Sequence, residues 1–488
     1  LTGAGAGRLA TGSAALSTLI AASATLSLIM QGSITISTWW TDHLAPFSLA
    51  LRLDGISVTM GLLVSFLGTV VLNFSRRYLA GDQGQAYFFS WMSLTLSAVL
   101  LLVLASNLLL LWLAWVATSL CLHRLLLFYP GRAGAVFAAR KKFVVSRIAD
   151  LCLLSAIFLL YQSFGTLDFD TLFARIKTGS GESLTLVGLL LVACAALKSA
   201  QFPFHSWLPD TMETPTPVSA FMHAGIINAG GFLIIRLSPL LVEAPGALTT
   251  LAIIGTLTAV FGAVVMLPQP SVKRALAFST IAQMGFMMLQ CGLGAFGLAL
   301  VHIVAHSLYK AHSFLHAGST IGAVPRAAKS LRTPALALGV IAGAVLVSAS
   351  ATIIHLLNPQ IVPHLGVFAL ILMLALAYGM ARAWSVSMRS RTITRTILAA
   401  TGIALLSLVL HGGAQTLFGD VPAHTPSVGL ITAIGIIFAG LFTFQVLLWR
   451  TGHHAWGRIF YVHALNGFYV GTWANRLLNN LWPSKTHS

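Results

Sequence analysis

The amino-acid sequence predicts an all-α polytopic membrane protein. Hydrophobic residues make up 57% of its 488 positions, charged residues only 8%, and its mean hydropathy is +0.88. Ordinary soluble proteins do not have this composition. Apolar stretches of about 20 residues, the length that a helix needs to cross a bilayer, recur from the N-terminal region to about Trp449. A transmembrane β-barrel would show short alternating strands instead, so the sequence favours a helical bundle.

Hydropathy predicts about fourteen spanning helices, and no charged or Pro/Gly-rich linker divides them. They lie near residues 13–30, 54–74, 86–105, 107–128, 143–162, 184–207, 216–240, 247–267, 272–293, 295–320, 334–357, 365–384, 395–412 and 428–449. Residues 1–450 are therefore expected to form one transmembrane bundle. Residues 451–488, which are rich in Trp, Tyr and His, are expected to form a cytoplasmic amphipathic tail on which a partner docks. Because the chain begins at Leu1 rather than Met, we expect its true start to lie upstream.

The net charge of +17 is a topology signal. With an even number of spans, both termini and the connections after even-numbered helices share one side, which holds most of the Lys and Arg, including Arg76 and Arg132. The other side holds little beyond Arg52, Arg175, Lys177 and Arg236. By the positive-inside rule both termini are cytoplasmic, and the basic excess does not indicate nucleic-acid binding.

Ionisable residues inside the predicted spans are the candidates for function, because a charge at mid-bilayer costs about 2.5–3.5 kcal/mol on insertion scales. Arg147 and Asp150 lie three residues apart in the fifth predicted span. They can pair on one helix face and neutralise each other, either as a structural ion pair or as part of a functional site.

The sixth predicted span contains Lys198, and Pro203 follows five residues later. Proline lacks a backbone N–H and its ring clashes with the preceding turn, so we predict a broken helix over Lys198 to Pro203. A broken helix exposes backbone carbonyls and admits water, so the lysine could load and release a proton there. The alternative is a lysine that snorkels from a helix end.

Two further basic residues lie near the starts of predicted spans. Pro215-Thr216-Pro217 opens the seventh span, and His223 follows about two turns into that helix. His223 is either part of a proton path or a neutral buried histidine that a hydroxyl satisfies. Lys273, at the cytoplasmic start of the ninth span, is either a proton entry point or a topology anchor.

The tenth predicted span carries His302, His306 and Lys310, whose spacing of four places them in one polar stripe. Histidine titrates near physiological pH, so such a stripe can pass protons through water. A zinc site is the rival hypothesis, but the helix has no Asp, Glu or Cys to complete one. We therefore predict no catalytic residue, metal or cofactor in this chain. The predicted proton or cation pathway comprises Lys198, His223, Lys273, His302, His306 and Lys310, with Arg147 and Asp150 as a supporting ion pair.

A family resemblance rests on the residues around Lys198. The stretch from Ala196 to Asp210, ALKSAQFPFHSWLPD, and the PTPVSA that follows resemble the signature of the antiporter-like subunits of respiratory complex I and of multisubunit sodium/proton antiporters. The resemblance runs from about residue 50 to 325. It implies two inverted five-helix repeats with broken helices and proton movement along a central hydrophilic axis. It also implies that the six pathway residues occupy the polar positions of the family.

Several positions depart from that family. Complex I subunits carry a glutamate that pairs with the broken-helix lysine, whereas here Val116 follows Trp115. Asp150 is the well-buried acid that can replace it, since Glu182, Glu213 and Glu243 lie outside the predicted spans. No lysine occurs between Lys329 and Lys485. A complete proton channel in both halves is therefore not expected.

These departures, the short C-terminus and the tail stretch YVHALNGFY at 461–469 resemble the DabB-type membrane subunits of bacterial inorganic-carbon accumulation complexes. That resemblance implies a DabA-type partner, similar to zinc β-carbonic anhydrases, which holds the zinc and hydrates carbon dioxide. This chain would then supply energy from a proton or sodium gradient. A proton-pumping subunit of a respiratory NADH:quinone oxidoreductase-type complex and a non-conducting membrane scaffold for a soluble enzyme are the alternatives.

Overall fold

The structure is a computed structural model that describes residues 3–37, 50–179, 184–320, 332–357, 365–418, 424–451 and 454–482. Helices dominate this part of the chain, and its two strands, β1 (Ile34–Ser37) and β2 (Ala50–Leu53), pair antiparallel. Glu182, Lys329 and Lys485 lie outside the described residues, as do positions 452–453 and 483–488 of the predicted tail.

Eleven helical segments of the described chain are long and apolar enough to cross a membrane. They are α1 (Gly3–Gln31), α2 (Gly55–Tyr78), α3 (Gln85–Leu104), α4 (Leu108–Leu126), α5 (Ala133–Phe164), the segment Thr216–Arg236, α12 (Pro245–Val265), α13 (Val272–Gly292), α15 (Thr333–Leu357), α16 (Leu365–Val386) and α18 (Val428–Thr451). The prediction of an all-helical polytopic membrane protein is confirmed, with eleven candidate spans where about fourteen were predicted.

The other three predicted spans coincide with helices that are not among these eleven candidates. The helix α7 (Thr185–Lys198) is only 14 residues long. The helix α14 (Phe296–Leu315) carries the His302, His306 and Lys310 stripe, which lowers its hydropathy. The helix α17 (Ser390–Phe418) has side chains described only as far as Ser407.

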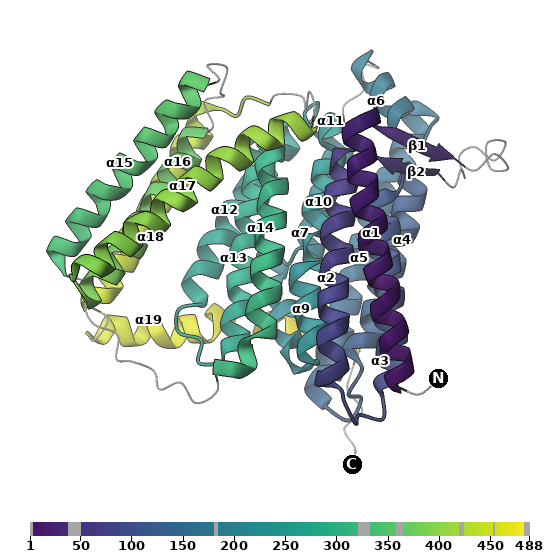
Figure 1. Ribbon diagram of the computed structural model, residues 1–488, viewed down its shortest axis with the longest axis horizontal. Helices are drawn as coiled ribbons and strands as arrows, with labels where there is room; N and C mark the ends of the chain where they lie inside the picture. Colours follow the sequence, from purple (N-terminus) through teal and green to yellow (C-terminus); the bar gives the residue numbers. More distant parts are fainter. Residues whose placement is uncertain are drawn as a thin grey trace.

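The helices form two groups that stand side by side (Figure 1). A single hydrophobic core fills the larger bundle from α1 to α14, whereas α15 to α18 pack around smaller cores. Contacts of α17 with α14 and of α18 with α12 join the two groups. The tail helix α19 (Ala455–Leu465) runs across one end of the bundle, at a steep angle to the spans (Figure 1). The helix α20 (Val470–Leu481) then contacts the turn at Phe204–Ser206 under the larger bundle.

Capping residues explain several helix starts. Asp54 precedes α2 and its Oδ1 accepts a hydrogen bond from the Ser57 amide at 2.9 Å. Asn107 caps α4 in the same way, and Asp168 caps the short helix α6 (Phe169–Lys177). Such side chains satisfy amides that have no partner within the helix. Gly165 ends α5 in the left-handed conformation, at φ +63°.

The sixth predicted span is broken as expected, because α7 ends at Lys198 and short turns follow. These are the 3₁₀ turns η1 (Phe204–Ser206) and η2 (Thr211–Glu213) and the short helix α8 (Trp207–Asp210). The seventh span is broken too, which we did not predict. It consists of α9 (Thr216–Ala224), the 3₁₀ turn η3 (Ile226–Asn228) and α10 (Ala229–Arg236). Asn228 Nδ2 donates to the Ala224 carbonyl at 2.9 Å and so satisfies a group that the break exposes.

The fifth span begins ten residues earlier than predicted, at Ala133. Lys141 and Lys142, which fall between the fourth and fifth predicted spans, therefore lie within α5 and are buried. The Lys141 ammonium is 2.8 Å from Asp210 Oδ2 and 2.6 Å from Oδ1 of Asn475 in the tail helix α20. These polar partners compensate the buried charge of Lys141 within the helix.

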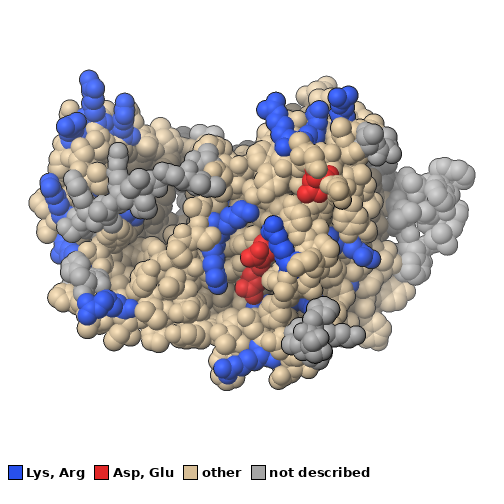
Figure 2. Space-filling view, turned by 90° about the horizontal axis from the view of Figure 1, so that it is seen from below, with Lys and Arg blue, Asp and Glu red and all other residues tan. Residues whose placement is uncertain are grey.

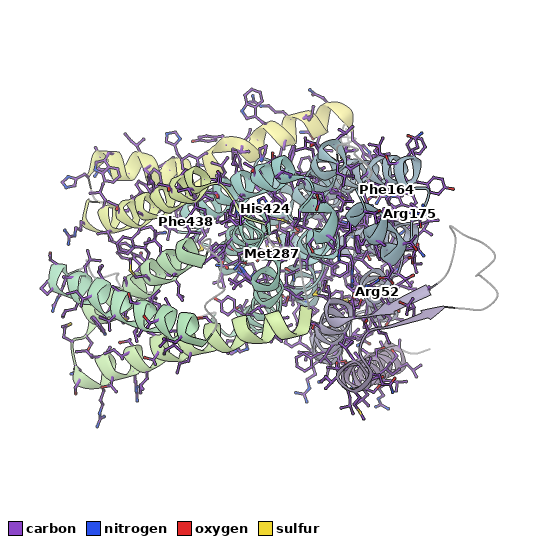
Figure 3. All side chains as sticks on the ribbon, turned by 90° about the horizontal axis from the view of Figure 1, so that it is seen from above. Arg52, Phe164, Arg175, Met287, His424 and Phe438 are labelled. Atoms are coloured by element: carbon purple, nitrogen blue, oxygen red, sulfur yellow. The ribbon has the colours of Figure 1, made fainter. Side chains whose placement is uncertain are left out.

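Charged groups meet at the opposite end of the bundle. Asp54 Oδ2 is 2.7 Å from Arg52 Nε and 2.5 Å from Arg236 Nη1. Burial by itself would raise the pKa of Asp54, but the Arg236 guanidinium and the Ser57 amide hold that pKa well below its ordinary value. Arg52, which is labelled in Figure 3, belongs to strand β2. Arg52 and Arg236, which the sequence places on one side of the membrane, thus lie at one end of the bundle.

Candidate functional site

The first cluster of ionisable side chains surrounds the end of α7, and we call it the lysine cluster (Lys142, Arg147, Asp150 and Lys198). Lys198 is 5% exposed, and its Nζ has no hydrogen-bond partner among the described residues. The ammonium lies 4.3 Å from the centre of the Trp115 ring on α4. A cation over an indole face is attracted by the ring quadrupole, so Trp115 fixes the position of Lys198.

Asp150 supplies the negative charge of the lysine cluster. Its Oδ2 lies 2.7 Å from Arg147 Nη2, so the predicted ion pair is confirmed. The Asp150 carboxylate also acts electrostatically on Lys198 and on Lys142. One buried carboxylate therefore serves three neighbouring cations.

Lys142 is the member of this cluster that sequence reasoning missed. It is buried, and its Nζ donates to the backbone carbonyl and to the hydroxyl of Ser119, each at 3.0 Å. Its charge also acts on Asp150. The eight-residue separation of Lys142 from Asp150 is the signal that could have identified it, because it puts both side chains on one face of α5.

The second cluster lies between α9, α13 and α14, and we call it the histidine cluster (His223, His302, His306 and Lys310). His223 is fully buried, with Nδ1 3.1 Å from Thr280 Oγ1 and its ring stacked on Phe314 at 4.4 Å. The Thr280 hydroxyl agrees with the alternative that His223 is a buried histidine with a satisfied hydrogen bond. The charge of Lys310 also acts on His223, so His223 interacts with the stripe on α14.

The stripe on α14 forms as predicted. Lys310 Nζ donates to the Leu276 carbonyl at 3.1 Å. The rings of His302 and His306 lie 6.1 Å apart, and His302 Nδ1 is 2.8 Å from Gln290 Oε1 on α13. Each of the three side chains thus faces α13 or a neighbouring ring rather than lipid. Within the described residues no group of three or more His, Cys, Asp and Glu comes together as a metal site would require.

The structure does not bring all six predicted residues together. Lys198 interacts with Asp150 rather than with the histidine cluster. The Ser199 hydroxyl next to it donates to the Ile227 carbonyl at 2.6 Å, which links the break after α7 to the break between α9 and α10. Lys273 is partly exposed in the first turn of α13, one turn before Leu276, and has no ion pair within the described chain.

Close packing holds the two broken helices in place. Met287 of α13 lies near the middle of the molecule (Figure 3) and packs against Gly231 of α10. A Cβ atom at Gly230 would lie 2.5 Å from Ser199 Oγ and 2.6 Å from the Ala195 carbonyl oxygen. The backbone of α10 therefore approaches α7 immediately before Lys198, which only glycine permits.

Comparison with known proteins shows that this chain is similar to membrane subunits of NADH:quinone oxidoreductases and Mrp antiporters. Residues 105–333 match the family model described as NADH:quinone oxidoreductase/Mrp antiporter, TM. Residues 39–89 match the model for the N-terminus of NADH-ubiquinone oxidoreductase (complex I) chain 5. The computed structure also resembles a chain of the Mrp complex from Dietzia sp., with a TM-score of 0.64 and 24% sequence identity. That match covers 100% of this chain and 61% of the other, and shows a shared fold.

Curated relatives give a finer comparison. The probable inorganic carbon transporter subunit DabB2 of Halothiobacillus neapolitanus is 39% identical over 461 residues, which cover 91% of this chain and 82% of that protein. The corresponding subunit DabB of Hydrogenovibrio crunogenus is 35% identical over 88% of this chain and 83% of its own length. NADH-quinone oxidoreductase subunit L of Mycobacterium tuberculosis is 39% identical, but over 59% of this chain and 46% of its own length.

Proposed function

Since this chain belongs to the DabB family of inorganic carbon transporter subunits, within the complex I and Mrp antiporter-like proteins, we propose that it couples an ion gradient to inorganic carbon uptake. Protons, or sodium ions, move through the polar clusters of the larger bundle. Their movement drives the capture of carbon dioxide or bicarbonate by a carbonic-anhydrase-like partner. The chain itself is not an enzyme and needs no cofactor; the partner, of DabA type, holds the zinc and performs the hydration.

The observation that carries this proposal is the buried lysine at the break of α7. Lys198 is buried, with an indole ring beside its ammonium and one carboxylate shared with two other cations. Burying an uncompensated charge is costly, so a fold retains such a lysine where its charge state serves a purpose. Gain and loss of a proton at Lys198 would change the charge balance of the lysine cluster and thereby the packing of the two broken helices.

The histidine cluster provides the second half of the pathway. Lys310 and His306 influence one another electrostatically, and the Lys310 charge also reaches His223. We propose that ions pass between the two clusters at the linked breaks around Ser199 and Ile227. Lys273 serves as the entry point from the cytoplasm.

We also propose the number of membrane spans and the side of the membrane on which the termini lie. Fourteen spans, formed by the eleven candidates together with α7, α14 and α17, put both termini in the cytoplasm of a bacterial cell. The spans contain two inverted five-helix repeats. The tail from residue 451 onward lies on the cytoplasmic face, where the partner docks.

Two alternatives follow from particular observations. The likeness to subunit L favours a pump in a respiratory complex, although it covers 46% of that protein. Val116, where the family has glutamate, favours a non-conducting scaffold. A pull-down in mild detergent from the native host, with zinc analysis, distinguishes them. Recovery of a zinc-containing carbonic-anhydrase-like chain supports our proposal, and recovery of quinone- or iron–sulfur-bearing subunits supports the respiratory pump.

The direct test is Lys198→Ala in a host that lacks carbonic anhydrase and carries the complete complex. We expect growth in ambient air to be lost while the complex still copurifies, because the substitution removes the proton-binding group without adding bulk. Lys177→Ala, which alters an exposed lysine of α6, is the matched control and should grow as wild type. Full growth of the Lys198→Ala strain would refute the role of Lys198.

A further inference from the structure

A cavity of about 350 Å³ opens at the shared end of three candidate spans, α1, α2 and α3. Three arginines line it: Arg8 from α1, and Arg76 and Arg77 from the last turn of α2. Asn73 and Gln85 contribute polar side chains to the same wall. The stem of Arg76 packs against Gly7 of α1, so this arginine lies at the contact between the two helices. Neither polar cluster of the proposed ion pathway includes any of these residues.

The positive charge of this cavity has no counterion within the described chain. None of the three arginines forms an ion pair with a described carboxylate. Asp82 lies in the turn between α2 and α3, but its Oδ1 accepts from the Gly84 amide at 2.8 Å and its Oδ2 faces the Tyr129 hydroxyl at 3.4 Å. The cavity therefore suits a ligand that brings its own negative charge. Guanidinium groups match the oxygens of a phosphate in geometry as well as in charge.

The surroundings of the cavity select a lipid rather than a soluble anion. The helix α1 exposes Leu9, Leu16 and Leu19 along its length and contacts the bundle on one side only. A hydrogen bond of 3.0 Å between the hydroxyls of Thr18 and Thr69 holds α1 against α2 midway along the helix. Acyl chains lying against the apolar surface of α1 would thus bring a headgroup to the level of Arg8. Figure 2 shows the basic end of the molecule, where lysine and arginine far outnumber acidic side chains.

We propose that this cavity binds the phosphate headgroup of an anionic phospholipid from the leaflet at the basic end of the bundle. Basic pockets between transmembrane helices at the cytoplasmic surface are suited to such headgroups. The bound lipid bridges α1 and the turn that joins α2 to α3. It thereby fixes a helix whose surface is mostly exposed to the bilayer.

Binding can be tested on the complete complex in nanodiscs, with dioleoylphosphatidylglycerol or dioleoylphosphatidylcholine as the probe and native mass spectrometry as the readout. We expect wild type to retain phosphatidylglycerol in preference to phosphatidylcholine. The R76Q/R77Q variant should weaken that retention roughly 25-fold, because each of the two arginines near an anionic headgroup contributes roughly a fivefold change in affinity. R389Q/R391Q, which changes two exposed arginines before and within the first turn of α17, is the matched control and should retain the lipid as wild type does.

The wild-type measurement can overturn the proposal without any variant. Equal retention of the two lipids would show that the cavity does not select an anionic headgroup. Displacement of phosphatidylglycerol by millimolar inorganic phosphate would mean that the arginines bind a free anion and that the acyl chains contribute nothing. Equal loss of lipid from R76Q/R77Q and R389Q/R391Q would assign the effect to surface charge in general. Failure of the proposed ion coupling would leave each of these outcomes unchanged.

Discussion

The charge balance around Asp150 decides how the lysine cluster can exist inside the bundle. Asp150 is ion-paired with Arg147 and acts on Lys142 and Lys198, so its removal would leave two buried lysines and one half-buried arginine without a carboxylate. Loss of one member of a buried ion pair costs about 3–5 kcal/mol, because the remaining charge stays desolvated. Deprotonation of a lysine could relieve part of that cost. Asp150 therefore controls both the stability and the charge state of the site.

Asp150→Asn should abolish growth of the carbonic-anhydrase-deficient host in ambient air and lower the melting temperature of the purified complex. Glu243→Gln, at an exposed carboxylate, should change neither. Val116 is the neighbour of Trp115 on α4, and the Trp115 ring lies against Lys198. Val116→Glu in the Asp150→Asn background would supply a new carboxylate in this part of α4 and should restore part of the growth. Normal growth of the single Asp150→Asn variant would show that the carboxylate is dispensable.

The sequence identified most of these groups, since an ionisable residue stands out in an apolar span. Lys198, Asp150 and the stripe on α14 were predicted from that contrast alone. Lys142 was missed, because next to Lys141 and Arg140 it resembled a cytoplasmic loop. Its burial depends on Ser119 of another helix, a tertiary contact that no local pattern contains.

At the scale of elements, the position of Lys198 depends on the contact between α7 and α10. Gly230→Ala should place a methyl group within 3 Å of the Ala195 carbonyl, a backbone atom that cannot move without distorting α7. Overpacking of this kind costs about 1–3 kcal/mol. We expect reduced thermal stability and loss of transport. Gly246→Ala is the control, because nothing lies within 4 Å of the added carbon, and it should leave stability and transport unchanged. A Gly230→Ala complex as stable as wild type would contradict the close approach of α10 to α7.

The tail helix α20 is joined to the break of α7 through Lys141. The Lys141 ammonium binds Asp210, the last residue of the short helix α8, and Asn475 of α20. Asn475→Ala should weaken the attachment by about 1.5–3 kcal/mol, the range for a hydrogen bond to a charged group. Hydrogen exchange in α20 should accelerate, and the docked partner should be lost more readily. Asn479→Ala, an exposed position on the same helix, is the control, and unchanged exchange in Asn475→Ala would mean that apolar contacts alone hold the tail.

The elements show where sequence reasoning works and where it stops. Hydropathy and Pro203 predicted the spans and the end of α7, because both depend on local chemistry. The break between α9 and α10 contains no proline, and its carbonyl at Ala224 is satisfied by Asn228 through a side chain that also donates to Ser307 of α14. Such a break depends on partners from distant helices and could not be located from spacing.

Over the whole molecule, buried polar groups are divided unequally between the two bundles. Both clusters belong to the larger bundle, whereas beyond Lys310 the described residues include a single buried polar side chain, Ser385. The sequence has no lysine between Lys329 and Lys485, so the second bundle also lacks a lysine like those of the two clusters. An ion path needs polar groups at intervals, so one path through the larger bundle is expected, and α15 to α18 serve to support it.

Arg382 of α16 provides the test of this division, because it lies on the second bundle with its guanidinium 4.4 Å from the centre of the Trp449 ring on α18. Arg382→Gln removes a cation–π contact worth about 0.5–1 kcal/mol at an exposed site. It should lower the melting temperature slightly and leave growth in ambient air intact, in contrast to Lys198→Ala. If Arg382→Gln abolished growth while the complex assembled normally, the second bundle would have to take part in ion movement, and the proposal of a single path would be wrong.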